Sequence, residues 1–228
     1  MLALRDVSLR YPYRTSIFSH EYHQVLNSVS LEVKKGEVLG ITGKNGQGKT
    51  TILRIMAGII APTSGKVCRQ AGTTVALLSL GLGLKPQLTG RDNAVLAAML
   101  QGATRDAAEA SLEEILQFSE LGDFFERPVK TYSSGMRARL GFSTALLTHV
   151  DTMLIDEVLS VGDSQFSVKA EQAIKERISG DQTVVLVSHS EAQLRSLCDR
   201  VVWLHDGEIA GDGEPDEVLE MYKDFVTC

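Results

Sequence analysis

The sequence has few cysteines, few prolines and no long apolar run, and each shortage excludes a class of protein. Among 228 residues there are 3 Cys and 5 Pro. The cysteines are too far apart for a metal site or a disulfide framework, so we expect reduced thiols. The longest nearly apolar stretch, 75–84, is much shorter than the ~20 residues of a membrane-spanning helix. The sequence therefore predicts a chain that reaches a membrane only through a partner.

Positive charge is also scarce. The chain has 23 Lys and Arg against 29 Asp and Glu, for a net charge of −6. A free-standing nucleic-acid binder carries a basic stripe, so we expect no nucleic-acid partner. Apolar residues make up 43% of the chain, and this fraction excludes low-complexity disorder. The length favours one large domain, or one domain with a subdomain, over several independent units.

The spacing of apolar residues changes twice along the chain. Alternation typical of half-buried strands covers 2–9 and 25–33, and short apolar strands are expected at 38–42 and 75–80. From about 88 to 149 the spacing becomes helical. Strand patterns then return at 152–155, 183–187, 201–204 and 208–210. This order predicts an α/β domain with a mostly parallel sheet and a helical insertion.

Residues 43–50, with the sequence GKNGQGKT, match the phosphate-binding loop G-x-x-x-x-G-K-[ST] between an expected strand and an expected helix. Glycines let backbone N–H groups surround phosphate oxygens, and the helix directs the positive end of its dipole at the anion. Lys49 adds an ammonium for the terminal phosphates, and the Thr50 hydroxyl is a ligand for Mg²⁺. The predicted nucleotide-binding residues of this segment are Gly43, Asn45, Gly46, Gly48, Lys49, Thr50 and Thr51.

A second acidic element follows downstream. The apolar segment 152–155 ends in Asp156 and Glu157. Such an acidic strand end is common by itself, but after a phosphate-binding loop it indicates a metal site. Asp156 is predicted to hold Mg²⁺, and Glu157 to orient or deprotonate the attacking water.

Together these motifs resemble the ATP-binding cassette of ABC transporters, and five further segments add to the resemblance. They are 58–65 (GIIAPTSG), 88–93 (LTGRDN), 132–136 (YSSGM), 160–163 (SVGD) and 187–189 (VSH). The resemblance spans 1–225 and implies the P-loop NTPase fold of this family, with a mostly parallel core sheet, an N-terminal antiparallel β subdomain and a helical subdomain. It further implies a single ABC ATPase domain, in which 1–87 and 150–225 form the nucleotide-binding core and 88–149 the helical subdomain.

The resemblance also implies roles for residues outside the phosphate-binding loop. Ser133 and Gly135, in the segment similar to the family signature, would complete the γ-phosphate site on the partner subunit. Asp163 would lie in the D-loop, and His189 would contact the γ-phosphate, so the implied catalytic residues are Glu157, His189 and Lys49. Adenine would stack on an aromatic ring, for which Tyr11 is the first choice and Tyr13 the second.

The YSSGM form of the signature is similar to that of bacterial polysaccharide exporters, and this similarity implies a function. ATP and Mg²⁺ would be the cofactors, and two copies of the chain would form a homodimer around two ATP molecules. The dimer would power a transmembrane permease of the ABC-2 type, at the cytoplasmic face of the bacterial membrane. The cargo would be a lipid-linked polysaccharide such as O-antigen, capsule or teichoic acid.

Other functions stay open at this point. The alternatives are an ABC ATPase for another transported substrate and a soluble ABC ATPase that serves ribosomes or DNA repair. A non-catalytic nucleotide-binding regulator is disfavoured because Lys49, Asp156, Glu157 and His189 are all present.

Two features depart from the general family pattern. The glutamine expected after the strand at 75–80 is missing: Ser79 occupies about that place, and Gln87 comes several residues too late. An insertion at Arg14–His23 carries several aromatic residues. It forms either a satellite cluster under a loop or a surface that faces lipid headgroups or a membrane subunit.

Overall fold

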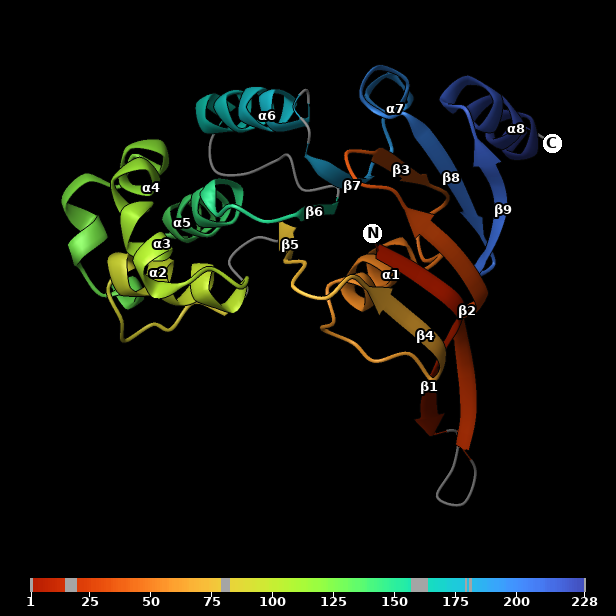
Figure 1. Cartoon of the computed structure of the whole chain (residues 1–228), viewed down its shortest axis with the longest axis horizontal. Coiled ribbons are helices and arrows are strands. Elements are labelled where there is room, and N and C mark those ends of the chain that lie inside the picture. The colour runs from red at the N-terminus through yellow and green to blue at the C-terminus, as the bar shows by residue number, and fades with distance from the viewer. Residues whose placement is uncertain are drawn as a thin grey trace. The chain divides into compact units, whose positions relative to one another are not determined.

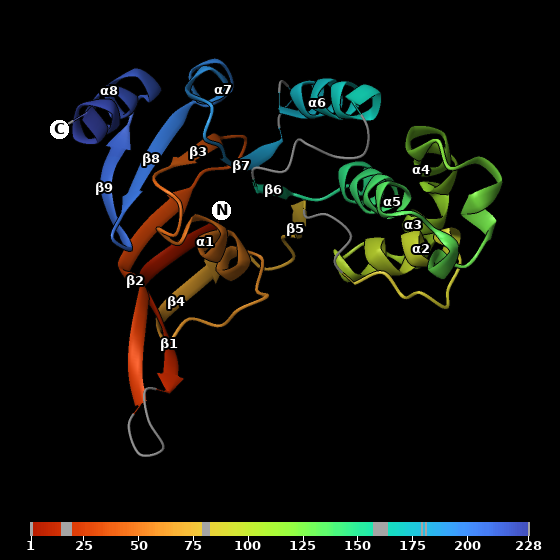
Figure 2. The same cartoon turned by 180° about the vertical axis from the view of Figure 1, so that it is seen from behind.

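The chain folds into two compact units, which we call the sheet unit (Met1–Thr73 and Asp181–Cys228) and the helical unit (Thr74–Gly180). Figure 1 shows their elements in a computed structural model, and Figure 2 shows them from behind. The structure describes residues 2–14, 20–78, 83–156, 164–178, 180 and 182–227.

One sheet of the sheet unit is antiparallel and has three strands. β1 (Leu2–Arg14) lies between β2 (His20–Val33) and β4 (Ser64–Arg69). The strands predicted at 2–9 and 25–33 are confirmed, and the antiparallel N-terminal β subdomain with them. Both strands are longer than predicted, because backbone pairing continues to Arg14 opposite His20. Much of the expected insertion is therefore a continuation of the β1–β2 hairpin.

Strand β4 was not predicted, and its sequence explains why. The segment 62–65 has the sequence PTSG, which predicts a turn. Five of the six residues of β4 are exposed, so the strand has no buried face and no alternation of apolar side chains. β4 pairs with β1 through backbone hydrogen bonds, with Val67 opposite Leu4. The side chains of β4 give no pattern from which this pairing could be predicted.

The parallel strands of the sheet unit form its centre. β3 (Val38–Thr42) lies between β7 (Thr183–Val187) and β8 (Arg200–His205), and both neighbours run parallel to it. β9 (Glu208–Gly213) pairs with β8 in the antiparallel direction. All residues of β3 and β7 are buried, as expected of parallel strands that are covered on both faces. The predicted mostly parallel arrangement is confirmed.

Three helices accompany these strands: α1 (Lys49–Met56), α7 (Glu191–Leu197) and α8 (Pro215–Thr227). The sequence predicts a helix over 49–58, and α1 begins at the predicted residue and ends two residues earlier. Gly58 follows it with a φ of 75°, a left-handed conformation that terminates helices. Ile52 and Ile55 on the inner face of α1 are fully buried.

The helical unit contains a short parallel pair of strands, β5 (Val75–Leu78) and β6 (Thr152–Asp156). Its helices confirm the change of periodicity that the sequence shows. They are α2 (Gly90–Leu100), α3 (Arg105–Ala110), α4 (Leu112–Ser119), α5 (Ser134–Leu147) and α6 (Ser164–Ile178), with 3₁₀ turns η1 (Gly122–Glu126) and η2 (Val129–Thr131). The apolar residues Ala107, Ala108, Leu112, Ile115, Leu116 and Phe118 lie on one helical stripe and predict a single helix after Thr104, but the structure divides it at Ser111, which ends α3 and precedes α4.

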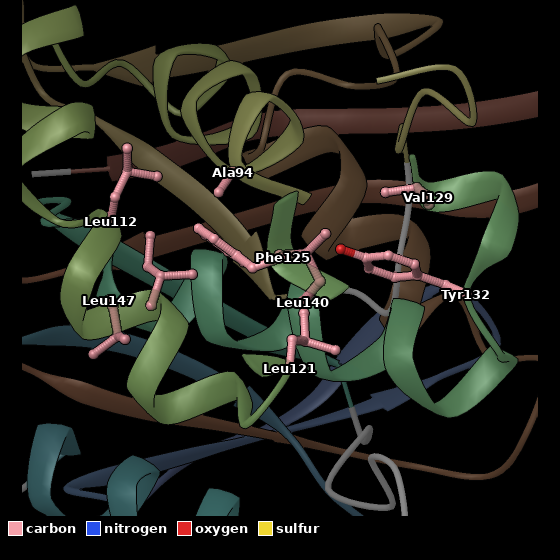
Figure 3. Close-up of a cluster of buried hydrophobic side chains, with 9 residues drawn as sticks. Ala94, Leu112, Leu121, Phe125, Val129, Tyr132, Leu140 and Leu147 are labelled. Carbon is pink, nitrogen blue, oxygen red and sulfur yellow. The ribbon is translucent and has the colours of Figure 1, made fainter. Parts of the chain in front are cut away.

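The helical unit has its own hydrophobic core, shown in Figure 3. Phe125 and Ile115 are almost completely buried at 1% and 0% exposure. Burial of a large apolar side chain contributes about 2 kcal/mol or more to stability, so this cluster can hold the helices together. Its members are Ala94, Leu112, Ile115, Leu121, Phe125, Val129, Tyr132, Leu140 and Leu147.

The described residues contain no membrane-spanning helix, and two of the cysteines are free thiols. Within the described ranges, no helix is both long and apolar enough to span a membrane. Cys68 and Cys198 are free thiols, as the sequence predicts, and Cys198 is buried. Burial raises the pKa of Cys198 to about 12, so its thiol stays protonated and unreactive at neutral pH.

Candidate functional site

The predicted phosphate-binding loop lies between β3, which ends at Thr42, and α1, which begins at Lys49. Ile41 of β3 pairs with Val187 of β7 on one side and with Val202 of β8 on the other. Because the three strands are parallel, the loop leaves the sheet at the edge where their carboxyl ends meet. Open parallel sheets bind their ligands at this edge.

Neighbouring protein atoms account for two of the loop's glycines. A Cβ on Gly43 would lie 2.3 Å from the Leu204 carbonyl oxygen, and one on Gly48 would lie 2.8 Å from Cδ2 of Leu26. Gly46 would have no atom within 4 Å of its Cβ, but its φ of 81° disfavours other residues. The sequence predicts that all three positions are glycine because the backbone must approach phosphate. The structure adds a second reason at Gly43 and Gly48, where neighbouring protein atoms leave no room for a side chain.

The Lys49 side chain lies within the loop. Its Nζ donates to the carbonyl oxygens of Gly43 at 2.7 Å and Lys44 at 3.0 Å, and the residue is 6% exposed. Hydrogen bonds from an ammonium are stronger than neutral ones, so they hold the charge in place. The N-cap of α1 is Gly48 in a left-handed conformation, and the positive end of the helix dipole faces the loop. The loop is therefore electropositive from two sources.

Two contacts hold the outer side of the loop to the C-terminal part of the sheet unit. Gln47 Oε1 accepts a hydrogen bond from the backbone N–H of Asp206, in the turn between β8 and β9. The Lys44 ammonium lies 5.1 Å from the centre of the Phe225 ring in α8. The sequence predicts neither contact, because Lys44 and Gln47 occupy positions that the loop motif leaves unspecified.

His189 lies at the same edge as the loop. It follows β7, and the backbone N–H of Ser188 donates to the Ile41 carbonyl oxygen at 3.4 Å. Ser188 Oγ accepts from the Ser190 N–H at 3.0 Å and donates to Gln193 Oε1 at 2.8 Å. These bonds fix the turn after β7, while the His189 side chain is exposed. The structure thus places the loop and the turn that carries His189 at the same edge of the sheet.

The aromatic residues considered for adenine lie on the long hairpin. Tyr11 in β1 is 43% exposed and pairs with His23 of β2. The guanidinium of Arg10 lies 4.5 Å from the centre of the Tyr22 ring, so Tyr22 already stacks on a cation. The side chain of Tyr13 lies outside the described part of the structure. Tyr11 therefore presents an accessible ring for stacking.

The predicted acidic residues lie in or beyond the helical unit's strand pair. Asp156 ends β6 and is half-buried, next to Ile155, which pairs with Leu78 of β5. Glu157, Asp163 and Ser79 lie outside the described residues, so the roles expected of them stay predictions.

The segment similar to the family signature opens α5. Ser133 is the N-cap, and its Oγ accepts a hydrogen bond from the Met136 N–H at 3.1 Å. Ser133 is exposed, and a Cβ on Gly135 would meet only Ser133 Oγ, at 3.8 Å. The positive end of this 14-residue helix is thus open to solvent, and such helix ends bind anions.

Comparison with known proteins agrees with these observations. The family model described as ABC transporter matches residues 26–160. A teichoic acids export ATP-binding protein TagH from Listeria innocua is 43% identical over 88% of this chain. The chain covers 59% of that relative. The O-antigen export system ATP-binding protein RfbB from Klebsiella pneumoniae is 41% identical over 87% of this chain, which covers 80% of RfbB.

Solved structures show the same fold. A dimeric post-hydrolysis state of the ATP-binding cassette MJ0796, bound to ADP and Pi, superposes with a TM-score of 0.76 at 25% identity. The match covers 94% of this chain and 99% of that one. A structure described as the ATP-binding subunit of an ABC transporter gives a TM-score of 0.75 at 24% identity, over 98% of this chain and 93% of the other. The predicted cassette fold is thereby confirmed.

Proposed function

Because the chain belongs to the ABC transporter family, we propose that it binds ATP and hydrolyses it to power the export of a lipid-linked polysaccharide. The observation that carries this proposal is the carboxyl edge of the sheet unit, where Lys49 lies within the phosphate-binding loop and His189 follows the neighbouring strand. A buried ammonium beside a helix N-terminus suits a polyphosphate chain.

The other predicted residues have roles that suit their chemistry. Backbone N–H groups of 43–50 would bind the β- and γ-phosphates, and Tyr11 would stack on adenine. Glu157 would orient or deprotonate the attacking water, and His189 would contact the γ-phosphate. Asp163 would lie in the D-loop of the same site.

The residues proposed to bind Mg²⁺ fit that ion. The Thr50 hydroxyl lies in the first turn of α1, and the Asp156 carboxylate ends β6; both residues are half-buried. Mg²⁺ prefers such oxygen ligands and keeps several waters. Thr50 and Asp156 would hold the ion, which would supply positive charge to neutralise the charge that develops during phosphoryl transfer.

The assembly we propose is a homodimer. Each ATP would lie between the phosphate-binding loop of one copy and Ser133 and Gly135 of the other, whose exposed helix end suits the γ-phosphate. A dimer of MJ0796 cassettes with similar folds supports this arrangement. Within each copy, residues 1–225 would form one cassette with 88–149 as the helical subdomain.

The names of the relatives support the proposed cargo and location. TagH serves teichoic acid export and RfbB serves O-antigen export, so we propose a polymer of this class, carried by an ABC-2 type permease. The dimer would associate with the membrane through that permease, on the cytoplasmic face. The chain spans about three fifths of the length of the Listeria innocua TagH. The proposed cargo and permease rest on the similarity over that shared part.

Hydrolysis and dimer formation test the catalytic part of the proposal. With ATP and Mg²⁺, the purified chain should release phosphate, and Glu157→Gln should lose most of this activity while an ATP-dependent dimer accumulates. Lys49→Ala serves as the control that binds ATP weakly and does not dimerise. Phosphate release and light scattering measure the two properties. Normal ATP turnover in Glu157→Gln would show that Glu157 does not activate the attacking water. If the unmodified chain releases no phosphate, the proposed ATPase activity is wrong.

The exporter part has a separate test. A tagged chain, extracted from its host in mild detergent, should copurify with one polytopic membrane protein. Copurification with ribosomes and no membrane protein would instead favour the soluble ABC ATPase.

A further inference from the structure

A buried asparagine closes the loop that precedes α2. Asn93 is 1% exposed. Its Oδ1 accepts from the Lys85 N–H at 2.7 Å, and its Nδ2 donates to the carbonyl oxygens of Lys85 at 3.0 Å and Thr89 at 2.8 Å. A buried amide that satisfies both its donors and its acceptor is costly to replace, because each lost partner leaves a buried polar group unpaired. The loop at 85–89 therefore has one strongly preferred shape.

The same loop is bonded to the segment that leads into the signature. The Lys130 N–H donates to the Pro86 carbonyl oxygen at 2.8 Å, and the Val129 N–H donates to that of Leu88 at 2.9 Å. A β-bridge between Thr89 and Pro128 lies beside these bonds. The position of residues 127–130 therefore depends on the position of the 85–89 loop, which Asn93 holds.

Tyr132 extends this connection to the residue next to the signature serine. Its hydroxyl donates to the Phe124 carbonyl oxygen at 2.6 Å, and the residue is 4% exposed. A Cβ on Gly90 would lie 2.2 Å from that hydroxyl, so the ring lies tightly over the first turn of α2. Figure 3 shows the hydroxyl pointing into the core cluster. Burial raises the pKa of Tyr132, and the hydroxyl keeps its proton for donation.

The first turn of α5 is bonded back to Tyr132. Arg137 donates from Nη1 to the Tyr132 carbonyl oxygen at 2.9 Å, one residue before the Ser133 cap. Hydrogen bonds thus run without a break from the 85–89 loop through 127–132 to the signature.

We propose that Asn93 and Tyr132 are positioning residues that lock the signature turn to the 85–89 loop, so that this loop determines where Ser133 and Gly135 present their groups to the partner's ATP. The effect of this lock on ATP rests on the proposed function, because the signature would act on the partner's ATP in a dimer. The lock itself is a property of one chain. Groups that contact a transferring phosphate must be placed closely, and a shift of about 1 Å can cost roughly 100-fold in rate.

Two variants test the lock, and a third is their matched control. Tyr132→Phe removes one hydroxyl and keeps the ring, and Asn93→Ala removes the amide. Thr144→Val removes a buried hydroxyl that donates to the Leu140 carbonyl oxygen at 2.8 Å in the middle of α5, away from the signature turn. Tyr132→Phe and Thr144→Val each remove one buried hydroxyl hydrogen bond in the helical unit, so they are the matched pair, and a purely structural role predicts the same loss of dimer for both. Asn93→Ala removes several hydrogen bonds at once and is the stronger perturbation of the loop.

Hydrogen exchange of the nucleotide-free chain is the first measurement. We expect Asn93→Ala to raise the exchange rate at 129–135 by about 10-fold or more, since the Val129 and Lys130 amides lose the ordered carbonyls that protect them. Tyr132→Phe should act at 131–135, and Thr144→Val should leave this segment unchanged. Equal protection of 129–135 in all variants and the unmodified chain would overturn the lock, whatever the chain does with ATP.

ATP-dependent dimer formation in the Glu157→Gln background is the second measurement. We expect Tyr132→Phe to need about 10-fold more protein to form the dimer, with ATP affinity of the monomer unchanged within about twofold. Thr144→Val should dimerise normally. Equal weakening of the dimer by Tyr132→Phe and Thr144→Val would reduce Tyr132 to a structural residue. If the unmodified chain binds no ATP, the proposed function fails, and the exchange measurement still decides the lock.

Discussion

The sheet unit and the helical unit fix their functional residues by different means. In the sheet unit, positions follow from strand register and from close packing of backbone. Ile41 pairs with Val187, and this pairing sets the phosphate-binding loop beside the turn that carries His189. The backbone of Gly43 lies against the Leu204 carbonyl oxygen. Few of these contacts depend on side chains outside the motif itself.

In the helical unit, the placement of Ser133 and Gly135 depends on Asn93, which lies outside the signature segment, and on Tyr132, the first residue of that segment. Asn93, forty residues before Ser133 in the sequence, bonds to the loop that contacts 127–130. Tyr132 adds a second attachment at the first turn of α2. The comparison teaches that a local motif can specify a site held by backbone, whereas a site held by side chains requires the tertiary structure.

The largest effect that distinguishes the units is expected from the core of the helical unit. Phe125→Ala should lower the free energy of unfolding of this unit by about 3–5 kcal/mol, the usual cost of removing a buried phenyl ring. Urea denaturation followed by hydrogen exchange measures the loss and locates it. Phe124→Ala is the control: its ring is 38% exposed, so it should cost less than about 1.5 kcal/mol. Equal losses would show that the cluster in Figure 3 does not hold the unit together.

An intermediate effect is expected in the sheet unit, where backbone packing determines the cost of replacing a glycine. Gly43→Ala should lower the free energy of unfolding by about 3 kcal/mol, because the new Cβ would meet the Leu204 carbonyl oxygen at 2.3 Å and the backbone must shift. Gly46→Ala should cost about 1 kcal/mol, the strain of a left-handed conformation in open space. Denaturant titration of both variants measures the difference. The opposite order would mean that phosphate, rather than packing, accounts for the glycine at 43.

The sequence predicts best the strands and the loop whose positions depend on the backbone. The strands at 38–42 and 183–187 are fully buried and read as continuous apolar runs, and both lie at the predicted positions. The phosphate-binding loop follows the first of them, since its glycines and lysine are adjacent in sequence. Strand β4 escaped prediction because most of its side chains are exposed.

The contacts that support the loop and the signature could not be predicted for a related reason. Gln47 meets Asp206, and Asn93 meets Lys85 and Thr89, through hydrogen bonds to backbone. Any polar side chain of suitable length has this ability, so residue type alone carries no signal of which backbone group it will find. The asparagine is buried in a segment whose pattern predicts only a capped helix.

The smallest effect concerns the cap of α5 and separates stability from function. Ser133→Ala should cost about 1 kcal/mol of stability, the usual value for an N-cap. Thr104→Ala removes the N-cap of α3, whose side chain accepts from the Ala107 N–H, and should cost about the same. Only Ser133→Ala should weaken the ATP-dependent dimer, measured by light scattering in the Glu157→Gln background, since Ser133 would also contact the partner's γ-phosphate. If both caps weaken the dimer equally, the signature serine acts through helix stability alone, and the helical unit would then place its site by the same backbone means as the sheet unit.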